Sequence, residues 1–344
     1  QEEIGLNGAE ALDKSLLSAR TMINLDSEDE GIFLTSCAGG ARVNCRFPMK
    51  KQELTGVRYE VEVSGLLGGH SGGEIHKERG NSNCILGRLL WKLSEKMPVG
   101  LVSADGGLAD NAIPRQTKAV VVVEETDAVS LEQQVAALEA ELGDELATKD
   151  PDVKVTAKKL IDTAETITCA TPEDTKRVAA FLQATPNGVQ AMSADMPGLV
   201  QTSSNLARVT AGSGEILVHC LLRSSLDSEK ADLGDRIAGV FELAGAEVAL
   251  EGGYDGWNPN PDSPILHTMI ASYESLFGRR PVVTAIHAGL ECGIIGTNYP
   301  ALDMISFGPT ILHPHSPDEK VNVASVGRFW QYLLATLRNV PFRS

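Results

Sequence analysis

The pattern of hydrophobic residues changes twice along this chain, and these changes limit the folds that it can adopt. Near the N-terminus, an apolar run at residues 21–25 ends in Asp26, and a second run follows at 32–37. A helix is predicted before them at residues 8–20, so this part reads as a sheet covered by helices. Further along, runs such as residues 59–63 alternate strictly between polar and apolar side chains. Such alternation is typical of antiparallel strands with one exposed face.

The middle of the chain combines alternating strands with amphipathic stretches, which predict helices at 80–97, 130–146, 172–184 and 228–244. A turn-rich linker follows at residues 252–261. After it, the pattern of the N-terminal part returns and predicts a helix at 264–277, strands at 281–286 and 302–307, and a helix at 321–339. The sequence therefore predicts an α/β domain with a mainly parallel sheet, built from residues 1–45 and 254–344. Residues 46–253 form an inserted α+β domain.

Length and charge narrow the class of protein. A chain of 344 residues exceeds the size at which a single core stops growing, which favours two domains. No run of 18 apolar residues exists, so we expect no membrane span. The formal charge of -16 disfavours nucleic acid and anionic membranes as partners. The first residue is Gln1 rather than Met, which predicts a processed, truncated or partial chain.

The six cysteines are scattered and form no CxxC motif. This distribution is typical of free thiols in a reducing cytoplasm, the expected location, although a secreted protein with disulfides is an alternative. Cys292 could be read as a thiol nucleophile. No histidine and asparagine or aspartate with a family's spacing accompany it, so we set that reading aside.

Carboxylates and a histidine stand where strands of the predicted sheet end. Glu2 and Glu3 precede the first helix, Asp26 ends a strand, and His315 follows the strand at 302–307. Ligand sites of such sheets gather at the carboxyl ends of the strands. Carboxylates and imidazole suit zinc, and Glu2 could act as general base toward a metal-activated water. The alternatives are local: the paired glutamates complement the dipole of the helix, and Asp26 caps a neighbouring element.

Other polar residues lie at turns or strand ends. His70 sits in a glycine-rich turn at residues 66–73, where close backbone approach would let it face a ligand. A turn with a surface histidine is the alternative. Asn111 and Arg223 lie at the ends of elements. An arginine there can hold a carboxylate through two hydrogen bonds, or it can form a surface salt bridge.

Six motifs, in this order, make the chain resemble the bacterial aminoacyl-histidine dipeptidases of the co-catalytic zinc exopeptidase superfamily. They are Glu2-Glu3-Ile4-Gly5-Leu6-Asn7-Gly8-Ala9, Asn24-Leu25-Asp26-Ser27-Glu28, Gly68-Gly69-His70-Ser71-Gly72, Asn111-Ala112-Ile113-Pro114-Arg115, His287-Ala288-Gly289-Leu290-Glu291-Cys292-Gly293 and His315-Ser316-Pro317-Asp318-Glu319. The likeness runs from residue 1 to about residue 340. Single motifs are widespread in the superfamily, but the ordered set is specific.

The resemblance implies a role for each matching residue. Glu2 corresponds to the general base, Glu3 and His315 to ligands of one zinc ion, and Asp26 to a ligand of the other. Other divalent metals are alternatives to zinc. His70 corresponds to a histidine of the inserted lid domain that polarises the scissile carbonyl, often across a dimer interface. The resemblance thus implies two metals per active site.

Substrate and assembly follow from the same resemblance. Asn111, Arg223 and Gly289 fall where family members contact substrate, and Arg223 corresponds to the partner of the substrate's C-terminal carboxylate. The resemblance implies hydrolysis of dipeptides, with Xaa-His substrates such as carnosine preferred, by a homodimer that forms through the lid domain.

The chain departs from the family pattern at its start. The family's earlier His-x-Asp motif and its bridging aspartate are absent, so we expect a missing N-terminal segment, without which this polypeptide would lack full activity. Two alternatives stay open. One is a related amide hydrolase such as an aminoacylase or tripeptidase, and the other is a truncated, non-catalytic relative that acts in binding or dimerisation.

Overall fold

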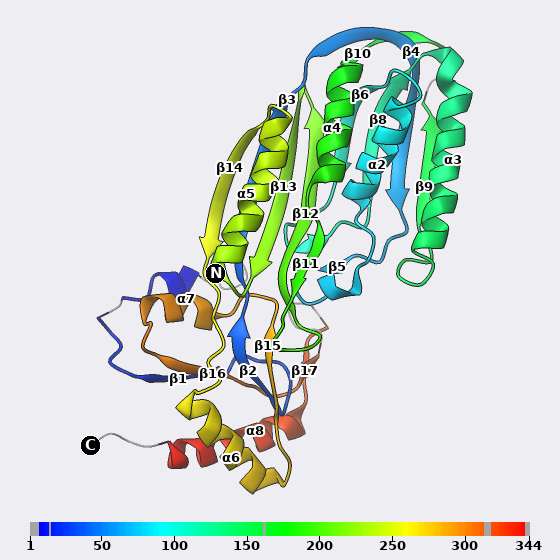
Figure 1. The fold of residues 1–344 in the computed structure, drawn as a ribbon. Coiled ribbons are helices and arrows are strands. Elements are labelled where there is room, and N and C mark those ends of the chain that lie inside the picture. The colour runs from blue at the N-terminus through cyan, green and yellow to red at the C-terminus, as the bar shows by residue number, and fades with distance from the viewer. Residues whose placement is uncertain (1–6, 14, 161–162, 313–317, 341–344) are drawn as a thin grey trace.

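The structure is a computed structural model that describes residues 7–13, 15–160, 163–312 and 318–340. Its strands form two main sheets, a small one and a large one, at opposite ends of an elongated molecule (Figure 1). The first helix, α1 (Asn7–Glu10), is shorter than the predicted one. The Asp13 carboxylate accepts the backbone N–H of Ser15 at 2.8 Å, a local bond that favours a turn over a continued helix.

The small sheet has the strand order β1-β16-β2-β15, formed by β1 (Thr21–Asn24), β16 (Asp303–Ser306), β2 (Ile32–Cys37) and β15 (Val282–Ile286). As the sequence predicts, β1 pairs with β16 in parallel, and β2 pairs with β15 in parallel. The two pairs meet at one antiparallel bridge between Ser306 and Leu34. The strands β2 and β15 are therefore antiparallel to β1 and β16.

Helices cover both faces of the small sheet, so this part of the molecule has three layers. The helices α6 (Pro264–Phe277) and α8 (Val323–Asn339) lie together on one face, and α7 (Glu291–Asn298) lies on the other (Figure 1). Aromatic rings fill the first interface, where Phe33 stacks on Tyr332 with ring centroids 5.5 Å apart. Burial is deepest at the central strands β2 and β16, whereas the outer strands β1 and β15 are mostly half-buried.

The large sheet is antiparallel throughout. Its strands follow the order β10-β4-β8-β6-β12-β13-β3-β14, with β9 on β4 and β11 on β12. Their bounds are β3 (Gly39–Pro48), β4 (Lys51–Ser64), β6 (Gly100–Gly106), β8 (Thr117–Val123), β9 (Lys154–Lys159), β10 (Glu165–Ala170), β11 (Gly188–Met192), β12 (Val200–Gly212), β13 (Glu215–Ser224) and β14 (Glu247–Tyr254).

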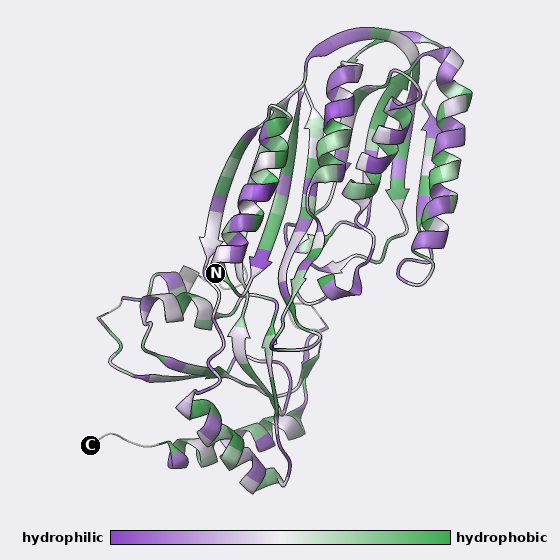
Figure 2. Cartoon of the chain, viewed as in Figure 1, coloured by the Kyte–Doolittle hydropathy of each residue, from purple (hydrophilic) through white to green (hydrophobic). Residues whose placement is uncertain are grey.

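One face of this sheet carries the four predicted helices, α2 (Ser82–Ser94), α3 (Ala128–Glu145), α4 (Pro172–Ala184) and α5 (Asp227–Leu243) (Figure 1). Hydrophobic and hydrophilic residues alternate in bands along these helices (Figure 2). The apolar sides pack onto the strands in one continuous core that includes Leu89, Leu138, Phe181 and Phe241. The four helices thus bury one face of the large sheet.

Short elements complete the fold. Two small sheets pair β5 (Gly69–His70) with β7 (Ala112–Ile113) and β17 (Ile311–Leu312) with β18 (Lys320–Val321), and two short 3-10 helices span Ile75–Lys77 and Glu125–Asp127. None of the helices in the described ranges is long and apolar enough to cross a membrane. Because β3 pairs within the large sheet, we propose that the inserted domain begins near Gly39, a few residues before the predicted boundary.

Candidate functional site

The backbone joins the two sheets closely where the chain passes between them. The Ala38 N–H points at the carbonyls of Ile286 and Ala288, at 3.2 and 3.1 Å. Cys37 and Trp257 exchange backbone hydrogen bonds of 3.2 and 3.0 Å beside it. The loop after β15 and the return from β14 are therefore fixed against the start of β3.

A loop of the large domain, residues 67–80, approaches this junction and carries His70; we call it the His70 loop. Asp150 is fully buried and holds both ends of the loop. Its Oδ1 accepts the N–H of Leu67 at 2.7 Å, and its Oδ2 accepts the N–H of Gly80 at 2.6 Å. One carboxylate thus sets the span of the loop, as hydrogen bonds to an ionised acceptor are stronger than neutral ones.

The His70 ring is oriented by its own loop. Its Nδ1 accepts the backbone N–H groups of Gly72 and Gly73, at 3.2 and 3.0 Å. An Nδ1 that accepts leaves the proton of the neutral ring on Nε2, so Nε2–H is the donor. The ring is exposed on strand β5. The glycines therefore give His70 one defined hydrogen-bond donor.

Asn111 lies beside this loop. His70 pairs with Ala112 in the small two-stranded sheet, and the Asn111 carbonyl accepts the Ser71 N–H at 2.8 Å. The buried Asn205 amide donates to the carbonyls of Asp110 and Ala112, at 3.0 and 2.9 Å, and so fixes the backbone on either side. The exposed Asn111 side chain is thereby held close to the start of the His70 loop.

Arg223 is buried near the end of β13, with 6% of its surface exposed. Its Nη1 donates to the Tyr254 hydroxyl at 3.2 Å, and its Nε finds no hydrogen-bond partner in the part of the chain that the structure describes. No carboxylate of the described residues forms an ion pair with it, which excludes the surface salt bridge within that part of the chain. A buried cation without a counter-ion is costly, so the position favours an anionic ligand.

Two glycines bring the segments together. A Cβ on Gly72 would lie 2.4 Å from the His287 carbonyl oxygen and 3.2 Å from the Arg223 Nε. A Cβ on Gly289 would lie 2.8 Å from the Tyr254 hydroxyl, which is the partner of Arg223. Only a residue without a side chain fits these approaches. The structure thus gathers His70, Asn111, Arg223 and Gly289, all four predicted from sequence, around one junction.

Two further residues of this junction were not assigned a role from sequence. His287 follows β15 and is 6% exposed, and its Nε2 lies 2.7 Å from the Oγ of Ser203 on β12. Burial, and then the nearby Arg223 guanidinium, lower the pKa of His287 to about 3. The ring is neutral at physiological pH. The signal in the sequence is a histidine directly after an apolar strand, together with the polar run 201–205 inside another strand.

Asp26 lies two residues beyond the end of β1, slightly farther than the sequence predicts, because the strand ends at Asn24. Its backbone N–H donates to the Asn24 Oδ1 at 3.1 Å, while its side chain is exposed and accepts no hydrogen bond from the described residues. Because β1 and β16 are parallel, the segment after β16 leaves the sheet at the same edge. An exposed carboxylate at this edge fits a metal ligand.

The remaining predicted site residues, Glu2, Glu3 and His315, lie outside the described residues. Within the described ranges, no three histidine, cysteine, aspartate or glutamate side chains gather as a metal site. The metal centre therefore stays a prediction that rests on the sequence.

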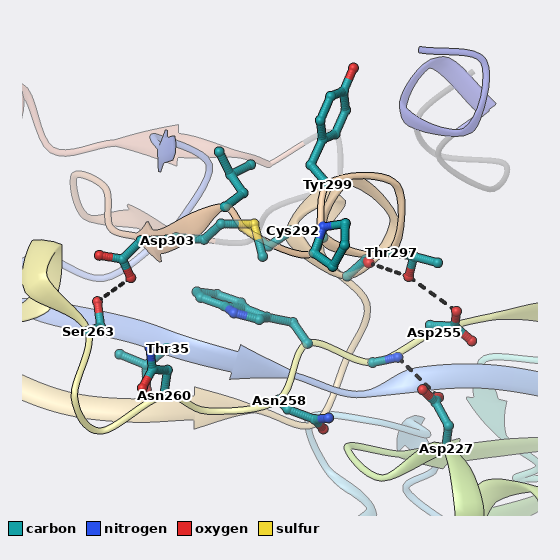
Figure 3. Close-up of a pocket in the computed structure, with 17 residues that line it drawn as sticks. Thr35, Asp227, Asp255, Asn258, Asn260, Ser263, Cys292, Thr297, Tyr299 and Asp303 are labelled. Atoms are coloured by element: carbon teal, nitrogen blue, oxygen red, sulfur yellow. Dashed lines mark hydrogen bonds between the residues drawn. The ribbon is translucent and has the colours of Figure 1, made fainter. Parts of the chain in front are cut away.

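A cavity of about 330 Å³ lies between α7 and the loop after β14, away from the His70 loop. Figure 3 shows hydrogen bonds on two of its sides: Ser263 Oγ donates to Asp303 at 2.5 Å, and Thr297 Oγ1 donates to Asp255 at 3.1 Å. Cys292 also lines it, and burial raises the pKa of that thiol to about 12. A thiol held protonated is a poor nucleophile, in agreement with the sequence reading.

Comparisons with known proteins identify relatives of this chain. A family model described as a peptidase dimerisation domain matches residues 61–150. The chain is 37% identical, over 342 residues, to the cytosol non-specific dipeptidase of Escherichia coli (strain K12), and the match covers 99% of this chain and 70% of that protein. The crystal structure of an aminoacylhistidine dipeptidase from Vibrio alginolyticus superposes with a TM-score of 0.91 at 36% identity, covering 100% of this chain and 70% of that one.

Proposed function

The chain belongs to the M20 metallopeptidase family of dipeptidases, and we propose that the junction around Arg223 binds the C-terminal carboxylate of a dipeptide during its hydrolysis. Arg223 carries this proposal, because its guanidinium is buried without a carboxylate partner among the described residues. A dipeptide has a carboxylate one residue beyond its scissile bond. A guanidinium can bind that group through two hydrogen bonds.

We propose that the protein hydrolyses a range of dipeptides and prefers Xaa-His dipeptides such as carnosine. The two relatives that match over most of their length are a non-specific dipeptidase and an aminoacylhistidine dipeptidase. An aminoacylase would take N-acylated amino acids, and a tripeptidase would need the carboxylate one residue farther from the scissile bond, by about 3.5 Å. A panel of these three substrate types would separate the alternatives.

For the metal centre, we propose zinc, two ions per site, with Glu3 and His315 on one ion and Asp26 on the other. The exposed Asp26 carboxylate supports its part of this ligand set. When bound, the metals lower the pKa of a water and polarise the peptide carbonyl. Glu2 takes the proton of the attacking water and passes it to the leaving amine.

His70 completes the proposed chemistry. Because its Nδ1 accepts two backbone N–H groups, its Nε2–H is the group that can donate to the carbonyl oxygen as negative charge develops there. Asn111 and the Gly289 loop border the same junction and contact the substrate in this proposal.

Assembly and location are proposed on the same basis. The dimerisation-domain match at 61–150 covers α2, β6, β8 and α3, which supports a homodimer through the large domain. His70 would then act within its own chain or across the interface. One relative carries the word cytosol in its name, and the six cysteines of this chain are unpaired, so we propose a cytoplasmic location.

The experiment that tests the Arg223 assignment compares a dipeptide with its C-terminal amide. In Arg223→Lys the charge stays but the planar fork is lost. We expect KM for carnosine to rise by about 10- to 100-fold, a loss of about 1.5–3 kcal/mol typical of a charged hydrogen bond. The amide should be cleaved poorly and equally by both proteins. Arg208→Lys, an exposed arginine on β12, serves as control. Equal losses on both substrates would reject the assignment.

A second experiment separates an enzyme from a non-catalytic binding protein. We expect Glu2→Ala to keep its metal and lose nearly all turnover, and His315→Ala to lose metal as well. Elemental analysis of zinc on each purified protein, with its rate on carnosine, measures both. Near-normal turnover of Glu2→Ala would remove Glu2 as the base, and absence of both metal and turnover in the natural protein would favour the binding protein.

A further inference from the structure

A hydrogen bond between two buried side chains joins the two sheets beside Arg223. The Ser203 Oγ, on β12 of the large sheet, lies 2.7 Å from the Nε2 of His287, which follows β15 of the small sheet. The two residues are 2% and 6% exposed. The hydrogen bonds of Ala38, Cys37 and Trp257 at this junction join backbones, whereas this one joins side chains of the two sheets and depends on their identity.

The loop that starts at His287 contacts several segments of the candidate substrate site. The His287 carbonyl faces Gly72 of the His70 loop, the Ala288 carbonyl faces the Ala38 N–H, and Gly289 packs against Tyr254. Tyr254 in turn accepts a hydrogen bond from Arg223. A displacement of His287 would therefore displace Gly289 relative to Arg223.

The charges around His287 favour its neutral form. Arg223 and His70 face the ring, and both oppose a positive charge on it. A neutral ring leaves Arg223 as the buried cation of the junction. The imidazole can then accept the Ser203 hydroxyl proton or donate to its oxygen, so the contact persists in either tautomer.

We propose that Ser203 and His287 are positioning residues, whose hydrogen bond holds the Gly289 loop at a fixed distance from Arg223 so that residues of both sheets bind one carboxylate. The inference rests on the proposed function, since it assigns these residues to the carboxylate subsite. They act through Gly289 and Arg223 rather than on the reacting atoms. Their loss therefore affects binding of the carboxylate more than the chemical step.

The matched test is Ser203→Ala against Ser204→Ala in the natural protein. Both serines are buried neighbours on β12, but the Ser204 hydroxyl has no hydrogen-bond partner among the described residues. In Ser203→Ala we expect KM for carnosine to rise about tenfold, as for an unpaired buried nitrogen, with kcat changed by less than about threefold. We also expect faster hydrogen exchange in residues 287–290. Ser204→Ala should match the wild type in each measurement.

A second pair of variants keeps the test independent of how Ser203→Ala folds. In His287→Gln the amide nitrogen can reach the position of Nε2, whereas in His287→Asn it is too short to do so. We expect the Gln variant to keep KM within about threefold and the Asn variant to behave like Ser203→Ala. Equal KM and equal exchange in the two variants, or no change in Ser203→Ala, would overturn the proposal.

The exchange measurement also separates this proposal from the proposed function. A wild type that cleaves no dipeptide would refute the function, and exchange at residues 287–290 would still decide whether Ser203 and His287 hold the loop. Cleavage with an unchanged KM in Ser203→Ala would refute the positioning role and leave the function standing.

Discussion

Arg223 and His287 are two basic side chains in one buried cluster, and burial has different consequences for them. A guanidinium keeps its charge when it is buried, so Arg223 favours a ligand that brings the opposite charge. An imidazole can release its proton instead, and the pKa of His287 falls to about 3 because the ring is buried beside Arg223. The cluster thus holds one fixed cation and one neutral ring.

The lowered pKa of His287 predicts how stability depends on pH. An unfolded histidine has a pKa of about 6.5, so between about pH 6.5 and 3 the unfolded chain binds a proton that the folded chain does not. The free energy of unfolding should be full above about pH 6.5 and fall as pH falls through this window. His287→Gln removes this contribution, so the wild type should lose stability relative to the variant from about pH 7 to 4.

Urea unfolding of both proteins across this range measures the effect, and the difference between them cancels the carboxylates that they share. Arg223 and His70 are the charged and titratable groups that oppose protonation of the ring. Parallel curves for the two proteins would show that His287 has an ordinary pKa in the folded state.

Individual residues of this cluster show which parts of the candidate site can be predicted from the sequence and which cannot. His70 was a candidate because its glycines are neighbours in the chain, and Arg223 because it ends an apolar strand, while their roles came from the family resemblance. The bond between Ser203 and His287 could not, because 84 residues separate the partners and nothing local sets their distance. The polar run in β12 indicated only that buried partners had to exist.

At the scale of elements, the His70 loop shows how one side chain shapes a segment. Asp150 accepts the N–H groups of Leu67 and Gly80, so it determines how the loop leaves and re-enters the large domain. The ring of His70 is then set by the glycines within the loop. The fixed ends of the loop and the fixed orientation of the ring together place the Nε2–H donor of His70 at the junction.

We therefore expect Asp150→Asn to loosen the His70 loop. The amide offers only one oxygen, so its NH₂ group would face one of the two N–H donors, at a cost of about 1–3 kcal/mol. Hydrogen exchange in residues 67–80 should become faster and kcat should fall. Asp152→Asn, an exposed neighbour, is the control. Unchanged exchange in the Asp150 variant would mean that the loop is held by other contacts.

The bounds of α2, α3, α4, α5, α6 and α8 were predicted closely, because each of these helices has an apolar stripe of sufficient length. The predicted start of α4 at residue 172 is confirmed, where Thr171 accepts the N–H of Asp174 and a proline occupies the first turn. The helix at 8–20 was wrong beyond Glu10, since the Asp13 side chain competes for the backbone there. Whether a short polar segment is helical depends on such local hydrogen bonds, which hydrophobic periodicity does not detect.

At the scale of the whole molecule, the cysteines are mostly packed inside the protein as free thiols. All six are free, and five are buried. Burial raises the pKa of Cys37 to about 11, and of Cys45 and Cys84 to about 12. We expect a thiol reagent such as DTNB to react slowly with the native protein near neutral pH and to titrate six thiols after denaturation. Fewer than six in denaturant would indicate a disulfide.

The pairing of the small sheet also bears on the order in which the protein can form during synthesis. β1 and β2 are not neighbours; each pairs with β16, and β2 also pairs with β15, strands that come from near the other end of the chain. As the ribosome extends the polypeptide, the whole inserted domain can already fold before β15 and β16, the described partners of these two early strands, are made. Within the part of the chain that the structure describes, the small sheet is thus completed only in the last stage of translation, when the domain that carries His70 and Arg223 is already in place.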